Sequence, residues 1–422
     1  MLCFFLGTIK REDNDVIKES LLGGLDVDRY QTTSTKESPC NLWTSNSSAV
    51  LNPSCITQIS RTYSLRHDVA QWCLAPSHQP NIFLKRPQLI SNNEEPVVGI
   101  IFIKNTKAAS STGAGVTLRI AEQVGRRVLH HPPNNNNINQ TTLAPMSCVR
   151  NWTHAFANHR GHAHRHATRS VLWTIVRQPD KRDVSAFVFF EHARKGVPMH
   201  QDNNQDTVLA YLQAQKSGQF RYLHDQYIAD ENLQPDFQKW YQTNSHNLST
   251  ILQEMLQRYD FIALAERWQE SLAVLTLLWN LRVEDVIVLS SKTKGGYDDG
   301  KFRKQCHKIP HASSLLSSSY GEVQDYLQLS HATHNLDHAL YAAANASLDR
   351  TIQSLGFEKV QRQLQRVKQL QDTAERACKT VAVYPCSSIG VLQRAAAKQS
   401  CYIDDSGCGH ACVDEVLRVE NV

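Results

Sequence analysis

The chain has 422 residues, of which 41% are hydrophobic and 20% are charged, as in a folded protein. This length gives room for one large α/β domain with extensions, or for two modest domains. The net charge of +5 is mild, and Lys and Arg are scattered without a dense basic block, so a nucleic-acid partner is not expected. The sequence has no apolar run of the roughly 18–20 residues that a membrane-spanning helix needs.

The first 92 residues are polar, rich in Ser, Thr and Asn, and only weakly periodic. Such a composition predicts a stem or a poorly ordered lead-in over residues 1–92. The opening nine residues are apolar, but Lys10 to Asp13 follow at once, without a basic n-region or an evident cleavage site. The folded domain is expected to begin near residue 93.

A strand, a turn and a helix are expected between residues 97 and 128. Val97 to Ile103 is an apolar, β-branched run of strand length. Small residues follow it, and then Val116, Ile120 and Val124 recur at helical spacing. A strand that turns into a helix leaves backbone N–H groups pointing at one spot, where the helix dipole adds partial positive charge. The turn therefore suits a phosphate group.

The side chains of this turn strengthen the interpretation. Lys107 supplies a full positive charge, and hydroxyl donors follow it. A Walker A loop would place its Lys at the end of the turn, so the order here is different. The turn is expected to cradle the 5′ end of a nucleotide with Lys107, Ala109, Ser110, Ser111 and Thr112.

A second strand and helix are expected after residue 170. Val171 to Val176 is an apolar strand that runs into Arg177, and an apolar helix is expected from Ala186 to Ala193. Ser185 stands eight residues after Arg177. An Arg offers a planar fork to a phosphate, and a hydroxyl at the start of a helix can reach the same anion.

A third unit is expected over residues 259–289. The pattern predicts a strand from Phe261 to Ala265, a helix from Trp268 to Leu281 and a further strand from Val286 to Leu289. Glu266 follows the first of these strands. Its carboxylate either orients a substrate or braces the site, or it simply caps the next helix.

Histidines cluster between residues 150 and 169, a stretch with five His, four Arg and no acid. A metal site is one interpretation, although no carboxylate or Cys accompanies the cluster, and a basic surface loop is the other. The five are His154, His159, His162, His164 and His166.

The C-terminal part has a helical pattern from Leu336 to Cys378, with apolar residues at spacings of three and four from Phe357 onward. A helix packed against the domain is favoured over a coiled coil, because the register covers only about three heptads. Five Cys in the last 45 residues and Cys306 make six, which allow 15 pairings and suit lumenal disulfides. Zinc held by Cys401, Cys408, His410 and Cys412 is the rival interpretation.

Taken in order, the loop Lys107-Ala-Ala-Ser-Ser-Thr112 and the Arg177–Ser185 pair resemble the donor-binding elements of Golgi carbohydrate sulfotransferases. The nearest likeness is the galactose-3-O-sulfotransferase family. Two later phrases, around Glu266 and over Leu336–Tyr341, also resemble stretches of such enzymes. There are departures: Ala108 stands where Thr is usual, Gln178 replaces an acid, and Gly113 and Gly115 loosen the first helical turn.

The resemblance implies a P-loop-like α/β fold, with a central parallel sheet flanked by helices and a helical C-terminal extension. The sulfotransferase domain would span residues 93–350, and the helical extension with the Cys-rich tail residues 351–422. The implied cofactor is 3′-phosphoadenosine-5′-phosphosulfate (PAPS), with its 5′ end on the Lys107 loop and its 3′-phosphate on Arg177 and Ser185. Lys292 and Lys294 fall in a late basic loop that would close over the nucleotide.

The implied reaction moves a sulfuryl group from PAPS to a carbohydrate hydroxyl by in-line displacement. Lys107 would neutralise the leaving phosphate, and no metal is expected, because cationic side chains supply the charge. His154 is the favoured base, since related uronyl 2-O-sulfotransferases keep theirs a little over 20 residues before the Arg. The rival bases are His159, His162, Glu191 and His192.

The implied partner is a carbohydrate acceptor, and the implied compartment is the Golgi, where an N-terminal membrane anchor is usual but is not visible in this sequence. Sequons such as Asn345 are compatible with a glycoprotein. A non-catalytic glycan- or nucleotide-binding protein on a decayed sulfotransferase scaffold is the alternative function. A P-loop kinase would need Mg²⁺ ligands and a Walker-type loop, which the sequence does not show.

Overall fold

The computed structural model describes residues 40–43, 50–67, 69, 97–130, 149–153, 165–193, 195, 205–214, 218–224, 237–290, 296–297, 308–309, 321–331, 336–381, 391 and 409–419. All of them belong to one compact unit that begins at Cys40.

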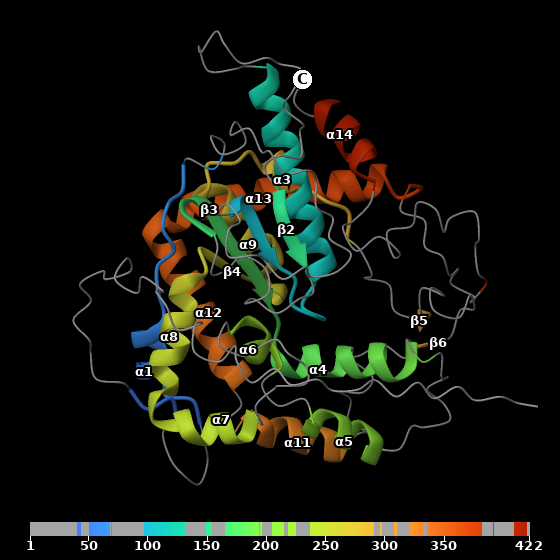
Figure 1. The fold of residues 1–422 in the computed structure, drawn as a ribbon. Helices are drawn as coiled ribbons and strands as arrows, with labels where there is room; N and C mark the ends of the chain where they lie inside the picture. The colour runs from blue at the N-terminus through green and yellow to red at the C-terminus, as the bar shows by residue number, and fades with distance from the viewer. Residues whose placement is uncertain are drawn as a thin grey trace, which may run out of the picture. The chain divides into compact units, whose positions relative to one another are not determined.

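A parallel four-stranded sheet forms the centre of this unit, with the strand order β2-β1-β3-β4 (Figure 1). The strands are β1 (Val97–Ile103), β2 (Val149–Thr153), β3 (Arg165–Val176) and β4 (Phe261–Leu264). Residues 100–103 of β1, 171–176 of β3 and 261–264 of β4 are buried, as expected of a parallel sheet covered on both faces. A separate antiparallel pair joins β5 (Gly296–Tyr297) to β6 (Lys308–Ile309).

Helices account for most of the remaining described residues. They are α1 (Pro53–Ile59), α3 (Ser110–His130), α4 (Pro179–Phe187), the π-helix η4 (Val188–Ala193), α5 (Gln205–Ala214), α6 (Gly218–Leu223), α7 (Phe237–Asn244), η5 (Ser245–Asn247), α8 (Leu248–Arg258), η6 (Ala265–Arg267), α9 (Trp268–Leu278), η7 (Val283–Val286), α11 (Gly321–His331), α12 (Leu336–Leu355), α13 (Phe357–Ala377) and α14 (His410–Val419).

Aromatic residues of the sheet hold α3 and α9 in place. Phe102 on β1 and Trp173 on β3 lie side by side, with ring centroids 4.5 Å apart. Trp279, just beyond α9, meets Trp173 edge-on at 6.2 Å. Helix α3 packs so closely on this surface that a Cβ on Gly113 would come within 2.6 Å of the Phe102 ring. Gly113 therefore permits close helix–sheet packing instead of merely loosening the first turn.

Helices α4, α5 and α11 form a layer of their own (Figure 1). Their contact is a small apolar cluster, separate from the main core, built from Val184, Phe187, Val208, Leu212, Val323 and Leu327. The helix expected over 186–193 is part of this layer, but it starts earlier, at Pro179, and continues as the π-helix η4.

The expected strand over Val286–Leu289 is wrong. Val283–Val286 forms the 3₁₀-helix η7, and the following residues join no sheet in the described chain. Their apolar side chains are still buried, and the Val288 carbonyl accepts a hydrogen bond from Gln371 Nε2 at 2.7 Å. An apolar run predicts burial, but it does not show whether a side chain or a neighbouring strand satisfies the backbone.

The C-terminal helices confirm the expected packing against the domain. The pattern from Leu336 to Cys378 divides into α12 and α13 at Gly356, which has φ of 91°. The periodic apolar residues of α13 are buried, except Phe357, which is 65% exposed. A disulfide joins Cys378 at the end of α13 to Cys412 on α14. Cys412 is therefore not a zinc ligand in this structure.

Part of the segment assigned to the lead-in packs against α8 and α12. Cys55, Ile56 and Ile59 of α1 are buried in the main core, and a disulfide links Cys55 to Cys40. The Arg61 amide donates to Ser347 Oγ on α12 at 3.0 Å. The domain boundary near residue 92 stays a prediction. Within the described part of the chain, no helix combines the length and the hydropathy needed to cross a membrane.

Candidate functional site

The sheet has a topological switch point between β1 and β3. The chain leaves β1 toward β2 on one side, and it leaves β3 toward β4 on the other. In open parallel sheets a crevice forms at such a point, outside the carboxyl ends of the two strands, and ligands bind there. The loop that follows β1 and the residue that follows β3 meet at this edge.

The loop after β1 has an unusual backbone. Lys107 and Ala109 both adopt left-handed conformations, with φ of 62° and 57°. Such conformations cost energy in residues other than Gly, and they concentrate at ligand-binding turns. Ala108 between them is fully buried, which leaves no exposed side chain at the position where Thr is usual. Residue patterns gave no signal for these two conformations.

Helix α3 begins directly after this loop. Its helical ladder starts with the Gly113 amide, which donates to the Ala109 carbonyl at 3.1 Å. Ser110, Ser111 and Thr112 therefore form the first turn of the helix, whose amides point along the axis toward the N-terminal end. This turn contains no acidic residue, so no carboxylate of the helix itself competes for an anion there.

Lys107 lies against an aromatic ring. Its Nζ atom is 4.2 Å from the centroid of the Phe189 ring on η4. A ring face attracts an ammonium group by its quadrupole and limits the conformations of the long side chain. No residue pattern in the sequence indicated a role for Phe189. Phe189 also lies on a π-helix, and π-helical turns are frequent at functional sites.

Arg177 joins the two halves of the crevice. Its Nη1 donates to the Lys107 carbonyl at 3.2 Å, so the residue after β3 contacts the loop after β1. Its Nε lies 3.9 Å from Glu266 Oε1. Burial lowers the pKa of Arg177, and the negative charge of Glu266 opposes this shift. The guanidinium therefore stays charged at neutral pH while it is partly withdrawn from water.

Glu266 braces this end of the site. Besides approaching Arg177, it accepts a hydrogen bond from the Gln178 amide at 3.1 Å. Tyr341 on α12 also bonds to this carboxylate, and burial together with the Glu266 charge raises the pKa of Tyr341 to about 12. Glu266 thus supplies a carboxylate to the loop in which Gln178 replaces the usual acid.

A buried charged cluster on α4 contacts the loop that follows β1. Arg182 on α4 donates to Thr106 Oγ1 at 3.3 Å and to Asp183 Oδ1 at 2.6 Å. Burial raises the pKa of the Asp183 carboxyl to about 7, against the lowering effect of Arg182. Asp337 and Asp180 raise it further through their negative charge. The cluster ties α4 to the turn that carries Lys107.

The other predicted residues have different placements. Ser185 is half-buried on α4, one turn before Phe189. Glu191 is in an ion pair with Lys195, and His192 is buried, with its ring 5.0 Å from that of Phe187. The remaining predicted residues lie outside the described residues: His154, His159, His162, Lys292 and Lys294.

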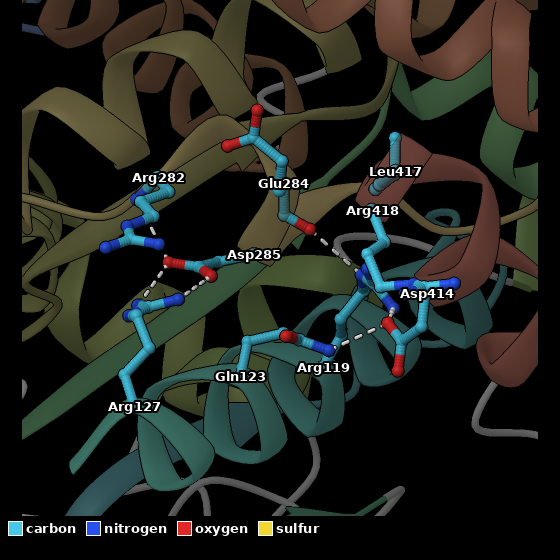
Figure 2. A pocket seen from close by; sticks show the side chains of 9 residues that line it. All are labelled: Arg119, Gln123, Arg127, Arg282, Glu284, Asp285, Asp414, Leu417 and Arg418. Atoms are coloured by element: carbon cyan, nitrogen blue, oxygen red, sulfur yellow. Dashed lines mark hydrogen bonds and ion pairs between the residues drawn. The ribbon is translucent and has the colours of Figure 1, made fainter. Parts of the chain in front are cut away.

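A groove of about 590 Å³ lies elsewhere, between α3, η7 and α14 (Figure 2). Arg119 donates to Asp414 Oδ1 at 2.6 Å and to the Glu284 carbonyl at 3.0 Å. Arg127 makes a bidentate pair with Asp285. Figure 2 shows these charges directed at one another across the groove. The groove holds matched ion pairs and none of the predicted site residues.

The fold and site define an α/β protein with a strand–turn–helix unit at a sheet switch point. Residues 55–383 match the family model described as galactose-3-O-sulfotransferase. The chain therefore belongs to the galactose-3-O-sulfotransferase family, which confirms the resemblance found in its sequence. No curated protein matches the chain significantly. No solved structure matches it significantly either.

Proposed function

We propose that this chain is a carbohydrate O-sulfotransferase that uses PAPS as donor and has a P-loop-like nucleotide site at the β1/β3 crevice. Family membership supports the activity class. The main support for this donor site is the hydrogen bond from Arg177 Nη1 to the Lys107 carbonyl, at 3.2 Å. Two cationic residues separated by 70 positions in sequence meet at one switch point, beside the first turn of α3.

The 5′ side of the donor would be held by the loop after β1. Lys107 supplies positive charge where the leaving phosphate gathers negative charge, and the ring of Phe189 supports its ammonium group. The hydroxyls of Ser110, Ser111 and Thr112 and the amides of the first turn, with that of Ala109, would hold the phosphate oxygens. Much of the rate enhancement would come from positioning.

The 3′-phosphate would be held by Arg177 and Ser185. Arg177 offers a planar fork that is already fixed by Lys107 and Glu266. Ser185 shares its helix with Arg182, which anchors α4 to the loop. We also propose that Lys292 and Lys294 close over the nucleotide from the late basic loop.

When bound, PAPS supplies a sulfuryl group, whose transfer gives a sulfate ester and leaves 3′,5′-ADP. The chain's own tasks are to align the acceptor hydroxyl with the sulfur and to remove its proton. A His with a pKa near neutrality suits the second task, and His154 is the proposed base.

The compartment we propose is the Golgi lumen. The disulfides Cys40–Cys55 and Cys378–Cys412 support it, because such bonds persist in oxidising compartments. The division into a lead-in over 1–92, a catalytic domain over 93–350 and an extension over 351–422 remains part of this proposal.

A transfer assay tests the function. The purified chain is incubated with PAPS and a panel of galactose-bearing glycans, and mass spectrometry follows the products. We expect sulfate on a glycan hydroxyl, with release of 3′,5′-ADP. A chain that binds 3′,5′-ADP but sulfates no glycan would favour the non-catalytic alternative. A chain that binds no adenine nucleotide and sulfates nothing would contradict the proposal.

A further inference from the structure

We infer that Gln219 is a positioning residue that locks the two phosphate-binding segments of the site together, and that α12 holds Gln219 in place. The inference rests on the proposed function, because it concerns how the donor site is built. Gln219 lies on α6, a helix with no motif that the sequence analysis used, and its side chain is fully buried.

The side-chain amide of Gln219 pairs with Arg177 as a neighbouring strand would. Its Oε1 accepts from the Arg177 amide at 2.9 Å, and its Nε2 donates to the Arg177 carbonyl at 2.7 Å. Arg177 stands one residue beyond β3, where the sheet no longer supplies a partner. The primary amide thus satisfies both backbone groups of the residue that carries the guanidinium.

The same amide also reaches the loop after β1. Oε1 of Gln219 accepts a second hydrogen bond, from Asn105 Nδ2 at 3.1 Å. Asn105 Nδ2 in turn donates to the Ile175 carbonyl on β3 at 3.1 Å. Asn105 is fully buried and precedes Lys107 by two residues. One side chain therefore ties together the backbones that present Lys107 and Arg177.

Helix α12 fixes Gln219 through its first turn. Asp337 is fully buried, and its carboxylate accepts from the amides of Gln219 at 2.9 Å and Phe220 at 2.6 Å. Tyr341, one turn later on the same helix, bonds to Glu266, which faces Arg177. This accounts for the Leu336–Tyr341 phrase in structural terms: it supports Arg177 from two sides.

The Gln219 link should fix the distance between the two proposed phosphate-binding residues, Lys107 and Arg177. A donor with a phosphate at each end binds well only if Lys107 and Arg177 keep a fixed separation and orientation. Loss of the Gln219 amide should loosen Arg177 relative to the Lys107 loop. It should therefore weaken recognition of the 3′-phosphate more than recognition of the adenosine or the 5′ end.

The test substitutes Gln219→Met, which keeps the side-chain length but removes the amide. Calorimetry measures the affinities for 3′,5′-ADP and for 5′-AMP, and their ratio reports the 3′-phosphate contribution. We expect this ratio to fall roughly tenfold, the effect of losing about one hydrogen bond's worth of orientation. Asn105→Ala removes the links from the β1 loop to Gln219 and to the Ile175 carbonyl but leaves both bonds between Gln219 and Arg177. It should lower the ratio by a smaller factor and serves if Gln219→Met does not fold.

Gln371→Met is the matched control. Gln371 is also a buried glutamine, and its Nε2 donates to the Val288 carbonyl at 2.7 Å, away from the site. Gln371→Met should lose about as much stability as Gln219→Met, but it should keep the wild-type ratio of the affinities for 3′,5′-ADP and 5′-AMP. An unchanged ratio in folded Gln219→Met and Asn105→Ala would overturn the inference. Failure of the proposed function is a different result, in which the wild type itself shows no preference for 3′,5′-ADP over 5′-AMP.

Discussion

Cationic side chains lie in two regions next to α3, and the two regions differ in how closely these cations are paired with carboxylates. In the groove beside α14, Arg119 meets Asp414 at 2.6 Å, and Arg127 is held by both oxygens of Asp285. At the carboxyl edge of the sheet, Arg177 approaches Glu266 only to 3.9 Å. Close, matched pairs leave little charge for a ligand, whereas a loosely paired cation keeps a field for an incoming anion.

The comparison separates structural from functional positive charge. The arginines of the groove bind α3 to η7 and α14, so their substitution should lower the free energy of unfolding. The cations of the carboxyl edge contact a backbone carbonyl, an aromatic ring and a carboxylate 3.9 Å away, so their substitution should reduce nucleotide affinity and turnover. The groove beside α14 is therefore not the best functional candidate, and the experiments that follow test this division.

Lys107→Ala should give the largest effect, on turnover. Removing one charge that stabilises a developing anion lowers kcat by about 10²–10³-fold. The fold should persist, because Lys107 is only partly buried and its Nζ contacts the face of the Phe189 ring. Steady-state transfer kinetics measure the loss, and a melting curve serves as the control. A wild-type kcat would remove Lys107 from the mechanism.

Cys412→Ser tests the other region by releasing α14. The disulfide to Cys378 closes a loop with a sequence separation of 34 residues. Its removal should lower the free energy of unfolding by about 3–4 kcal/mol on the chain-entropy model. Denaturant unfolding measures the change, and affinity for 3′,5′-ADP should not move. A loss of nucleotide affinity equal to that of a site variant would break the separation.

Asp414→Asn probes the charge of the groove directly. Arg119 is almost fully buried, and the substitution leaves its guanidinium with a neutral partner. We expect a loss of roughly 2 kcal/mol in the free energy of unfolding, the size of a charged hydrogen bond. Glu415→Gln is the control, because Glu415 forms an exposed pair with Arg418. It should have almost no effect.

The free energy of unfolding should depend on pH through the buried cluster that contains Arg182 and Asp183. Asp183 has a pKa of about 7 in the folded chain, above its unfolded value, so the folded state binds more protons between these two values. The contribution of Asp183 to stability is therefore largest at low pH and falls as pH rises toward 7. Asp183→Asn should flatten this slope, as measured by denaturant unfolding at several pH values. A slope equal to that of the wild type would assign the pH dependence to other groups.

The sequence predicted the parts of the fold that depend on local patterns. The bounds of β1 and the presence of a helix after it follow from the change in apolar period after Ile103, but α3 begins at Ser110, inside the segment expected as a turn. The Val286–Leu289 strand was wrong, because burial alone does not reveal the partner of a backbone carbonyl. Long-range partners were equally out of reach. Nothing near Gln219 indicates that it pairs with Arg177, and helical periodicity does not reveal the π-turn that brings Phe189 to Lys107.

The central claim is that Lys107 and Arg177 grip opposite ends of one doubly phosphorylated adenosine. Its most direct test is calorimetry of Arg177→Ala with 3′,5′-ADP and with 5′-AMP, compared with the wild type. The account predicts that the variant loses about 10–100-fold in affinity for 3′,5′-ADP, the worth of a charged hydrogen bond, and keeps its affinity for 5′-AMP. An equal loss for both nucleotides, or none for either, would contradict it.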